Sequence, residues 1–151
     1  MNTIQIRPAK NEDHDSIQTL AIQLGYSPTK ETILTGLKTM QINPDYEVIV
    51  IEENNMVVGW MTLCVRHRIE DVPFLQIAAI VTEENLRGKG FGKKLMDYAE
   101  TKAKEKQLSF IGLQSSKFRE NAHGFYEKIG YSKTKESFFF RKDVISGPAE
   151  R

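Results

Sequence analysis

A glycine-rich turn between an apolar strand and a helix constrains this sequence most. Phe74 to Val81 is a nearly continuous apolar run, which is typical of a central strand buried on both faces. The run leads into Arg87-Gly88-Lys89-Gly90-Phe91-Gly92 and then into an amphipathic pattern that predicts a helix to about Lys106. Glycines let backbone N–H groups approach an anion, and a helix N-terminus adds unsatisfied donors. The turn therefore predicts a local phosphate site, to which Arg87, Lys89 and Lys93 add positive charge.

Two common phosphate-binding motifs do not fit this turn. A P-loop needs four residues between its first glycine and Gly-Lys-Ser/Thr, whereas Gly88 and Gly92 are separated by three, and Lys94 takes the place of the hydroxyl. A dinucleotide-binding motif would need a glycine at Lys93 and a place near the start of a larger domain. A plain chain reversal would not need three alternating glycines beside Arg87. The site is therefore of a different type.

Length and composition indicate one soluble domain. The chain has 151 residues, of which 40% are hydrophobic and 27% charged, as expected of a globular protein. We expect a single domain over 1–145 and a loose tail over 146–151. With 21 Lys+Arg against 20 Asp+Glu the net charge is +1, which argues against a nucleic-acid partner. No apolar run approaches the length of a membrane span, and residues 1–10 lack a signal-peptide pattern. We therefore expect a cytoplasmic protein with no membrane partner.

The order of predicted elements gives the fold class. The pattern reads as one strand, two helices, three strands, a helix, a strand, a helix and a strand. It predicts an α/β (α+β) domain with a mixed central sheet of six to seven strands, flanked by about four helices on both faces. Cys64 is expected to be a buried strand residue. The expected strands and helices are Ile4–Pro8; Asn11 to Gly25; a helix capped by Ser27-Pro28; Tyr46–Glu52; Met56–Val65; Phe74–Val81; the helix to Lys106; Ser109–Gln114; Asn121–Lys128, closed by Gly130; and Ser137–Arg141.

Arg87, Gly90 and Gly92 match the spacing Arg/Gln-x-x-Gly-x-Gly/Ala. At this motif the chain resembles the GNAT superfamily of acetyl-CoA-dependent N-acetyltransferases. Further matching segments are Ile6-Arg7-Pro8-Ala9, Val57-Val58-Gly59, and Asn121-Ala122-His123-Gly124-Phe125-Tyr126-Glu127-Lys128-Ile129-Gly130-Tyr131. The resemblance implies the GNAT fold with acetyl-CoA as co-substrate. It implies that the pantetheine arm pairs with Ile80, Val81 and Thr82 and contacts Asn121 and Tyr126, and that the pyrophosphate is held by Arg87, Gly88, Lys89, Gly90, Phe91, Gly92 and Lys93.

The implied reaction, direct attack of an amine on the acetyl thioester, has three catalytic tasks: stabilising the oxyanion, protonating the departing thiolate and deprotonating the amine. The resemblance assigns residues to the first two. It implies that the backbone N–H of Val81 stabilises the oxyanion and that the Tyr126 hydroxyl protonates the departing thiolate. From the residues alone, Tyr126 is better interpreted as a core aromatic, and Asn121 as a helix cap that could also contact the pantetheine arm. The general base stays open, because Gln76 and Ala79 stand where related enzymes often carry a glutamate. The remaining candidates are water relayed by Glu83 or Glu84, a group of the preceding loop (His67, Glu70 or Asp71), or bulk solvent.

The acceptor is expected to be a primary amine of a small molecule. Arg-Pro-Ala, a histidine in the loop before the strand at 74–81, and Ala-His-x-Phe-Tyr are similar to aminoalkylphosphonate acetyltransferases; polyamines, aminoglycosides and amino acids are the other classes. Those phosphonate enzymes use a divalent metal, but Arg66-His67-Arg68 is poorer in histidine than their loop. No metal ligands are assigned, and the question of a divalent-metal requirement stays open. The alternative function is a non-catalytic acetyl-CoA-binding sensor or interaction module. The family resemblance also implies a homodimer.

Overall fold

The computed structural model of the protein describes residues 2–86 and 88–145, so the expected tail over 146–151 and the motif residue Arg87 lie outside the described residues. The chain divides into two compact units, one ending at Leu113 and the other beginning at Gln114. The first unit contains a mixed sheet with helices on both faces, which confirms the predicted fold class, although the sheet has five strands instead of six or seven.

Alternating and β-branched residues form the sheet of the first unit in the order β1-β2-β3-β4-β5. Its strands are β1 (Ile4–Pro8), β2 (Tyr46–Glu53), β3 (Met56–Arg66), β4 (Phe74–Thr82) and β5 (Ile111–Leu113). The first four pair antiparallel, and β5 runs parallel to β4. Asn54 and Asn55 close the β2–β3 hairpin with φ of 52° and 68°, a conformation that asparagine tolerates well. The strand expected over 109–114 is shortened to three residues.

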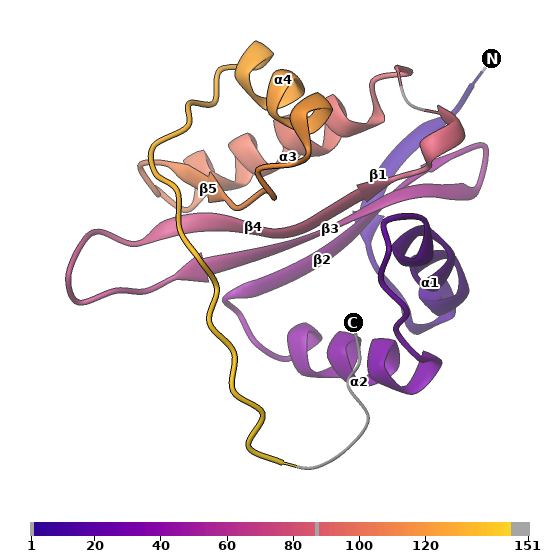
Figure 1. Ribbon diagram of the computed structural model, residues 1–151. Coiled ribbons are helices and arrows are strands. Elements are labelled where there is room, and N and C mark those ends of the chain that lie inside the picture. Colours follow the sequence, from indigo (N-terminus) through magenta and orange to yellow (C-terminus); the bar gives the residue numbers. More distant parts are fainter. Residues whose placement is uncertain (1, 87, 146–151) are drawn as a thin grey trace. The chain divides into compact units, whose positions relative to one another are not determined.

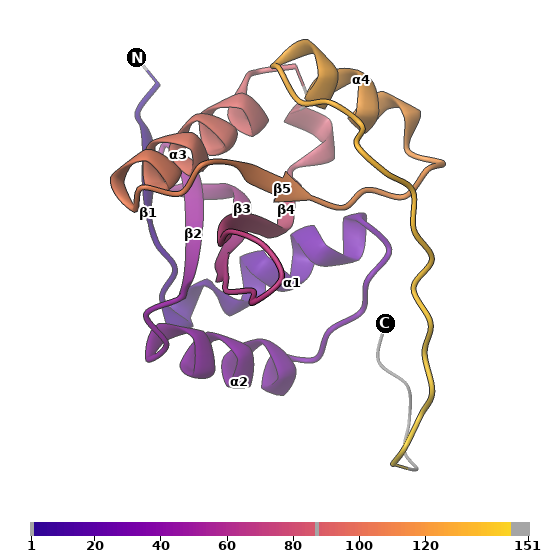
Figure 2. The same cartoon turned by 90° about the vertical axis from the view of Figure 1, so that its left-hand side faces the viewer.

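Amphipathic helices cover the two faces of this sheet (Figures 1 and 2). On one face lie the short 3₁₀ helix η1 (Asn11–Asp13), α1 (His14–Gln23) and α2 (Lys30–Gln41); on the other lies α3 (Phe91–Glu105). The α1–α2 side buries Ile17, Ile33 and Leu37 against Val50 of β2. Cys64 is buried in β3, as expected. Among the described residues, no helix is long and apolar enough to cross a bilayer.

The start of α2 differs from the expected Ser27-Pro28 cap. Thr29 is the N-cap, and its side-chain oxygen accepts the Thr32 backbone N–H at 3.1 Å. The cap therefore lies two residues later than expected, at the next hydroxyl residue along the chain, and Pro28 precedes the N-cap instead of occupying the first helical position.

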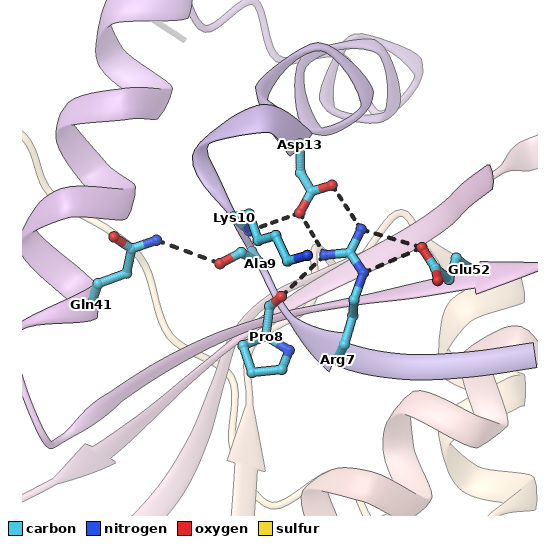
Figure 3. A network of polar contacts seen from close by, with 7 residues as sticks. All are labelled: Arg7, Pro8, Ala9, Lys10, Asp13, Gln41 and Glu52. Carbon is cyan, nitrogen blue, oxygen red and sulfur yellow. Dashed lines mark hydrogen bonds and ion pairs between the residues drawn. The ribbon is translucent and has the colours of Figure 1, made fainter. Parts of the chain in front are cut away.

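Arg7 joins β1, η1 and β2 through an ion-pair network (Figure 3). Its two terminal guanidinium nitrogens donate to Asp13 at 2.8 and 2.9 Å, and its Nε donates to Glu52 at 3.3 Å. Asp13 also accepts the Lys10 backbone N–H at 2.7 Å. The hydrogen bond from Arg7 lowers the pKa of the buried Asp13 carboxyl below its usual value. The network fixes the beginning of α1 to the edge of the sheet.

The second unit contains α4 (Glu120–Lys128), which ends before Gly130 at φ +104°, in agreement with the predicted helix. The predicted strand over Ser137–Arg141 was wrong, because residues 131–144 form no helix or strand. A strand needs a neighbour to pair its backbone groups, and none is paired with this segment in the described part of the chain. Phe138, Phe139 and Phe140 are 84–91% exposed.

Candidate active site

A β-bulge opens the edge of β4 halfway along the strand. Leu63 of β3 pairs with Ile77 and the adjacent Thr62 pairs with Ala79, so Ala78 is the extra residue. The parallel pairing of β4 with β5 ends at the same point, at Ile77. From Ala78 to Thr82, one side of β4 therefore has no strand beside it among the described residues. The expectation of a strand buried on both faces was wrong here, because Ala78 is exposed and Ile80 half-buried.

The direction of the backbone groups on this edge follows from the strand register. The Glu83 N–H donates to Val58 O at 2.8 Å, so Glu83 and Val58 are a hydrogen-bonded pair. Such pairs alternate along an antiparallel ladder, so Val81, which faces Trp60 two residues earlier, also points its N–H and C=O groups towards β3. The groups of Ile80 and Thr82 then point to the open side. The geometry favours the N–H of Ile80 over that of Val81 as a donor to a molecule lying along this edge.

Beyond the strand, the glycine loop (residues 88–90) leads into α3. Gly88 and Gly90 have φ of +92° and +86°, and Gly90 is the N-cap of α3. These left-handed conformations favour glycine, although a Cβ at either position would meet no atom within 4 Å. The first turn of α3 contains no acidic residue to offset the helix dipole. This turn begins at Phe91 and contains Gly92. Its N–H groups, which have no partner within the helix, are therefore suited to binding an anion.

The lysines expected to bind phosphate differ in their surroundings. Lys93 Nζ lies 3.0 Å from the Asp97 carboxylate one helical turn later, and both side chains are more than half exposed. An exposed pair of this kind contributes little energy and leaves Lys93 able to exchange partners. Lys89 is exposed in the glycine loop itself.

Glu83 follows β4 directly and is held by a side chain of α1. Gln23 Nε2 donates to both carboxylate oxygens of Glu83 at 3.0 Å, and Gln23 Oε1 accepts the Glu84 backbone N–H at 3.1 Å. Ala79 and Gln76 supply no carboxylate on the strand, so Glu83 is the half-buried acid nearest to the open edge in the sequence.

The loop candidates for the general base lie at the other end of β4 (Figure 1). His67 contacts Asp45 at 3.2 Å, Asp71 lies 3.6 Å from Arg68, and Glu70 is exposed. Since β4 has nine residues, its two ends are separated by roughly 27 Å at about 3.4 Å per residue. The structure does not bring this loop to the open edge at Ile80.

Tyr126 and Asn121 belong to α4 in the second unit. The Tyr126 ring is half-buried, with its centroid 5.4 Å from that of Phe125 and 6.2 Å from that of Tyr131. Burial raises the pKa of the Tyr126 hydroxyl, although Arg119 opposes this, so the group is a protonated donor at neutral pH. Asn121 is exposed at the second position of α4, whose N-cap is Arg119, so Asn121 is not the helix cap.

With this geometry in hand, comparison with known proteins gives the family. The family model described as "Acetyltransferase (GNAT) family" matches residues 14–131. The chain belongs to the GNAT acetyltransferase family. The match contains β4, the glycine loop and α4, which are the elements that carry the predicted site residues.

Individual relatives agree with this GNAT assignment. The chain is 36% identical over 115 residues to an uncharacterized N-acetyltransferase, YhdJ, of Bacillus subtilis (76% of this chain and 80% of that protein). It is 24% identical to an aminoalkylphosphonate N-acetyltransferase of Salmonella typhimurium (89% of this chain, 88% of that protein). A solved structure of the aminoglycoside N-acetyltransferase AAC(6')-Iy in complex with CoA has a TM-score of 0.83 at 16% identity and covers 94% of this chain and 96% of its own. That structural likeness shows a shared fold.

Two parts of this site had no signal in the sequence. Gln23 is the last residue of α1, where a polar side chain is ordinary. The bulge at Ala78 falls inside a nearly continuous apolar run, so the sequence pattern gives no sign of it. Within the described residues, no group of three or more His, Cys, Asp or Glu side chains could hold a metal ion.

Proposed function

We propose that this GNAT protein transfers the acetyl group of acetyl-CoA to a primary amine of a small molecule by direct attack. Acetyl-CoA is the co-substrate that membership of the family implies. One observation supports the proposal most: β4 has an open edge from Ala78 to Thr82, and the chain then passes through a 3₁₀ turn at residues 84–86 to the glycine loop and to the start of α3, whose first turn has no acidic residue. The open edge and the helix start offer backbone donors to an extended molecule with a phosphate end.

In this proposal the coenzyme lies along β4. Its pyrophosphate binds the N–H groups of the glycine loop and the first turn of α3, with Lys89 and Lys93 nearby. Its pantetheine arm pairs with Ile80 and Thr82, whose backbone groups point to the open side. The Ile80 N–H, in place of that of Val81, donates to the thioester oxygen as it becomes an oxyanion.

Two proton transfers accompany the reaction. The amine nitrogen attacks the carbonyl carbon, the C–S bond breaks, and the thiolate takes a proton from the Tyr126 hydroxyl. Glu83 receives the proton of the attacking amine through a water molecule, because its carboxylate is half-buried and bound by a neutral amide. The family match over 14–131 spans both units and supports their action as one domain over 1–145.

The amine class is the open part of the function, and two acceptors deserve priority. The relative from Salmonella typhimurium is named an aminoalkylphosphonate N-acetyltransferase, so aminoalkylphosphonates come first, and aminoglycosides follow because AAC(6')-Iy shares the fold. Thiol release from acetyl-CoA over a panel of these amines, polyamines and amino acids, with and without a divalent cation, tests the proposal. Turnover with any of them supports it. Tight acetyl-CoA binding without turnover on the whole panel would support the non-catalytic sensor instead.

A further inference from the structure

We propose that Gln23 is a positioning residue: it aims the Glu83 carboxylate and fixes the chain where β4 leaves the sheet and enters the phosphate-binding segment. The first half of this proposal rests on the proposed role of Glu83 as the base. The second half, the connection from α1 to the loop, stands on the contacts alone.

The contacts use nearly the full capacity of the Gln23 side chain. Its amide nitrogen donates to both oxygens of Glu83 at 3.0 Å, while its carbonyl oxygen accepts the Glu84 backbone N–H at 3.1 Å. A glutamine has two donors and one acceptor oxygen, and both ends are engaged by consecutive residues. The carboxylate and the following peptide are therefore held in one orientation.

Gln23 contacts the chain at the point where the pairing of β4 with β3 ends. The last β3–β4 backbone bond joins Glu83 N–H to Val58 O at 2.8 Å. The next residues form the 3₁₀ helix η2 (Glu84–Leu86), and Lys89 N–H returns to Leu86 O at 3.3 Å. The Gln23 contact to Glu84 thus holds the first residue of η2, and we expect its loss to change the path of the chain towards residues 88–90.

The helix that carries Gln23 is itself firmly placed. Helix α1 begins beside the ion pairs of Arg7 with Asp13 and Glu52 and buries Ile17 and Leu20. Its other end carries Gln23. A rigid element supports a precise orientation better than a loop does, and among the described residues Glu83 has this amide and no cation as its side-chain partner.

Three variants separate positioning from simple stabilisation. Gln23→Leu removes the three hydrogen bonds at similar size. The exchanged pair Gln23→Glu with Glu83→Gln restores an amide–carboxylate contact but moves the carboxylate onto α1. Gln18→Leu is the matched control, since Gln18 also lies on α1 and donates to Pro28 O at 2.9 Å, away from β4.

Hydrogen–deuterium exchange of the full chain tests the connection without any need for turnover. Gln23→Leu should speed exchange at Glu84 and through residues 88–90 and weaken coenzyme A binding by calorimetry about five- to tenfold, the equivalent of one or two lost hydrogen bonds. The exchanged pair should return both values towards wild type. Wild-type rates of deuterium uptake and wild-type coenzyme affinity in Gln23→Leu would overturn the proposed connection from α1 to the glycine loop. Equal effects in Gln18→Leu would also overturn it.

Kinetics with an accepted amine tests the aiming of Glu83. Gln23→Leu should lower kcat about tenfold with a smaller change in the KM for the amine, and the exchanged pair should keep a low kcat although its loop is restored. Wild-type kcat in both would overturn this half. Absence of turnover in the wild-type protein with every amine would contradict the proposed function and the aiming of Glu83, while the exchange and affinity results would still decide the connection.

Discussion

Asp13 and Tyr126 are ionisable side chains whose pKa values the fold moves in opposite directions for different reasons. The Arg7 hydrogen bond lowers the pKa of Asp13, whereas loss of water raises that of Tyr126. The first effect stabilises a carboxylate that supports α1. The second keeps a phenol protonated, which suits a proton donor. At the scale of single residues, a dominant hydrogen bond from a cation gives a structural carboxylate, whereas a dominant loss of water gives a candidate catalytic phenol.

Asp13→Asn should destabilise the protein at pH 7 by about 1–3 kcal/mol, because it leaves the half-buried Arg7 with one carboxylate fewer. The folded-state pKa of Asp13 is lowered, so its contribution is present above the unfolded-state pKa and disappears as the pH falls through the folded-state pKa. Urea unfolding at several pH values measures this. The difference from wild type should shrink in acid, and Asp15→Asn, at an 85% exposed side chain, should change stability by less than about 0.5 kcal/mol. A constant difference at all pH values would contradict the prediction.

Tyr126→Phe should lower kcat by roughly 10²–10⁴-fold, because the departing thiolate loses its proton donor. Coenzyme affinity should change little, since the ring is kept. Tyr131→Phe, which alters the neighbouring ring in the same way, is the control and should remain close to wild type. Normal turnover of Tyr126→Phe in the thiol-release assay would remove Tyr126 from the mechanism.

At the scale of elements, β4 and α3 contribute to the candidate site the backbone groups that they leave unpaired. The bulge at Ala78 ends the pairing with β5 and turns the backbone groups of Ile80 to the open side. Helix α3 begins at a left-handed glycine with no acid in its first turn. The unpaired backbone groups of β4 and the uncompensated N-terminus of α3 both lack partners within the described chain. Both lie on the C-terminal side of the bulge in β4. An extended ligand with a phosphate group satisfies both.

Gly90→Glu should abolish measurable coenzyme binding, because it adds negative charge and a side chain where the phosphates are proposed to bind. Gly90→Asn separates charge from backbone strain, since asparagine tolerates the φ of +86° better than most residues do. It should retain most of the affinity in calorimetry. Unchanged affinity in Gly90→Glu would sink the assignment of the loop, and equal losses in both variants would assign the effect to the backbone.

At the scale of the whole molecule, exposed apolar side chains indicate a surface that association would cover. Phe138, Phe139, Phe140, Val144 and Ile145 are 84–91% exposed. Large apolar side chains that are exposed close together in the sequence are candidates for burial by association. They support the expectation of a homodimer, which stays a prediction.

Light scattering at micromolar concentration should give the mass of a dimer, and Phe139→Lys should shift the protein towards the monomer because a buried charge opposes association. A wild-type monomer would refute the dimer. A dimer unaffected by Phe139→Lys would place the interface elsewhere.

The sequence by itself determined the elements whose signals are local. Local patterns of apolar, turn and capping residues located β1 to β4 and α1 to α4. The spacing of Arg87, Gly90 and Gly92 indicated the family that the comparison confirmed. Tertiary structure decided what depends on partners far apart in the chain. The bulge depends on the register of β4 against β3, and that register also decides whether the N–H of Ile80 or of Val81 faces the open side. The hydrogen bonds from Gln23 to Glu83 form because α1 lies beside the end of β4. The strand expected at 137–141 failed for the same reason, because a strand forms only where a neighbour accepts its hydrogen bonds.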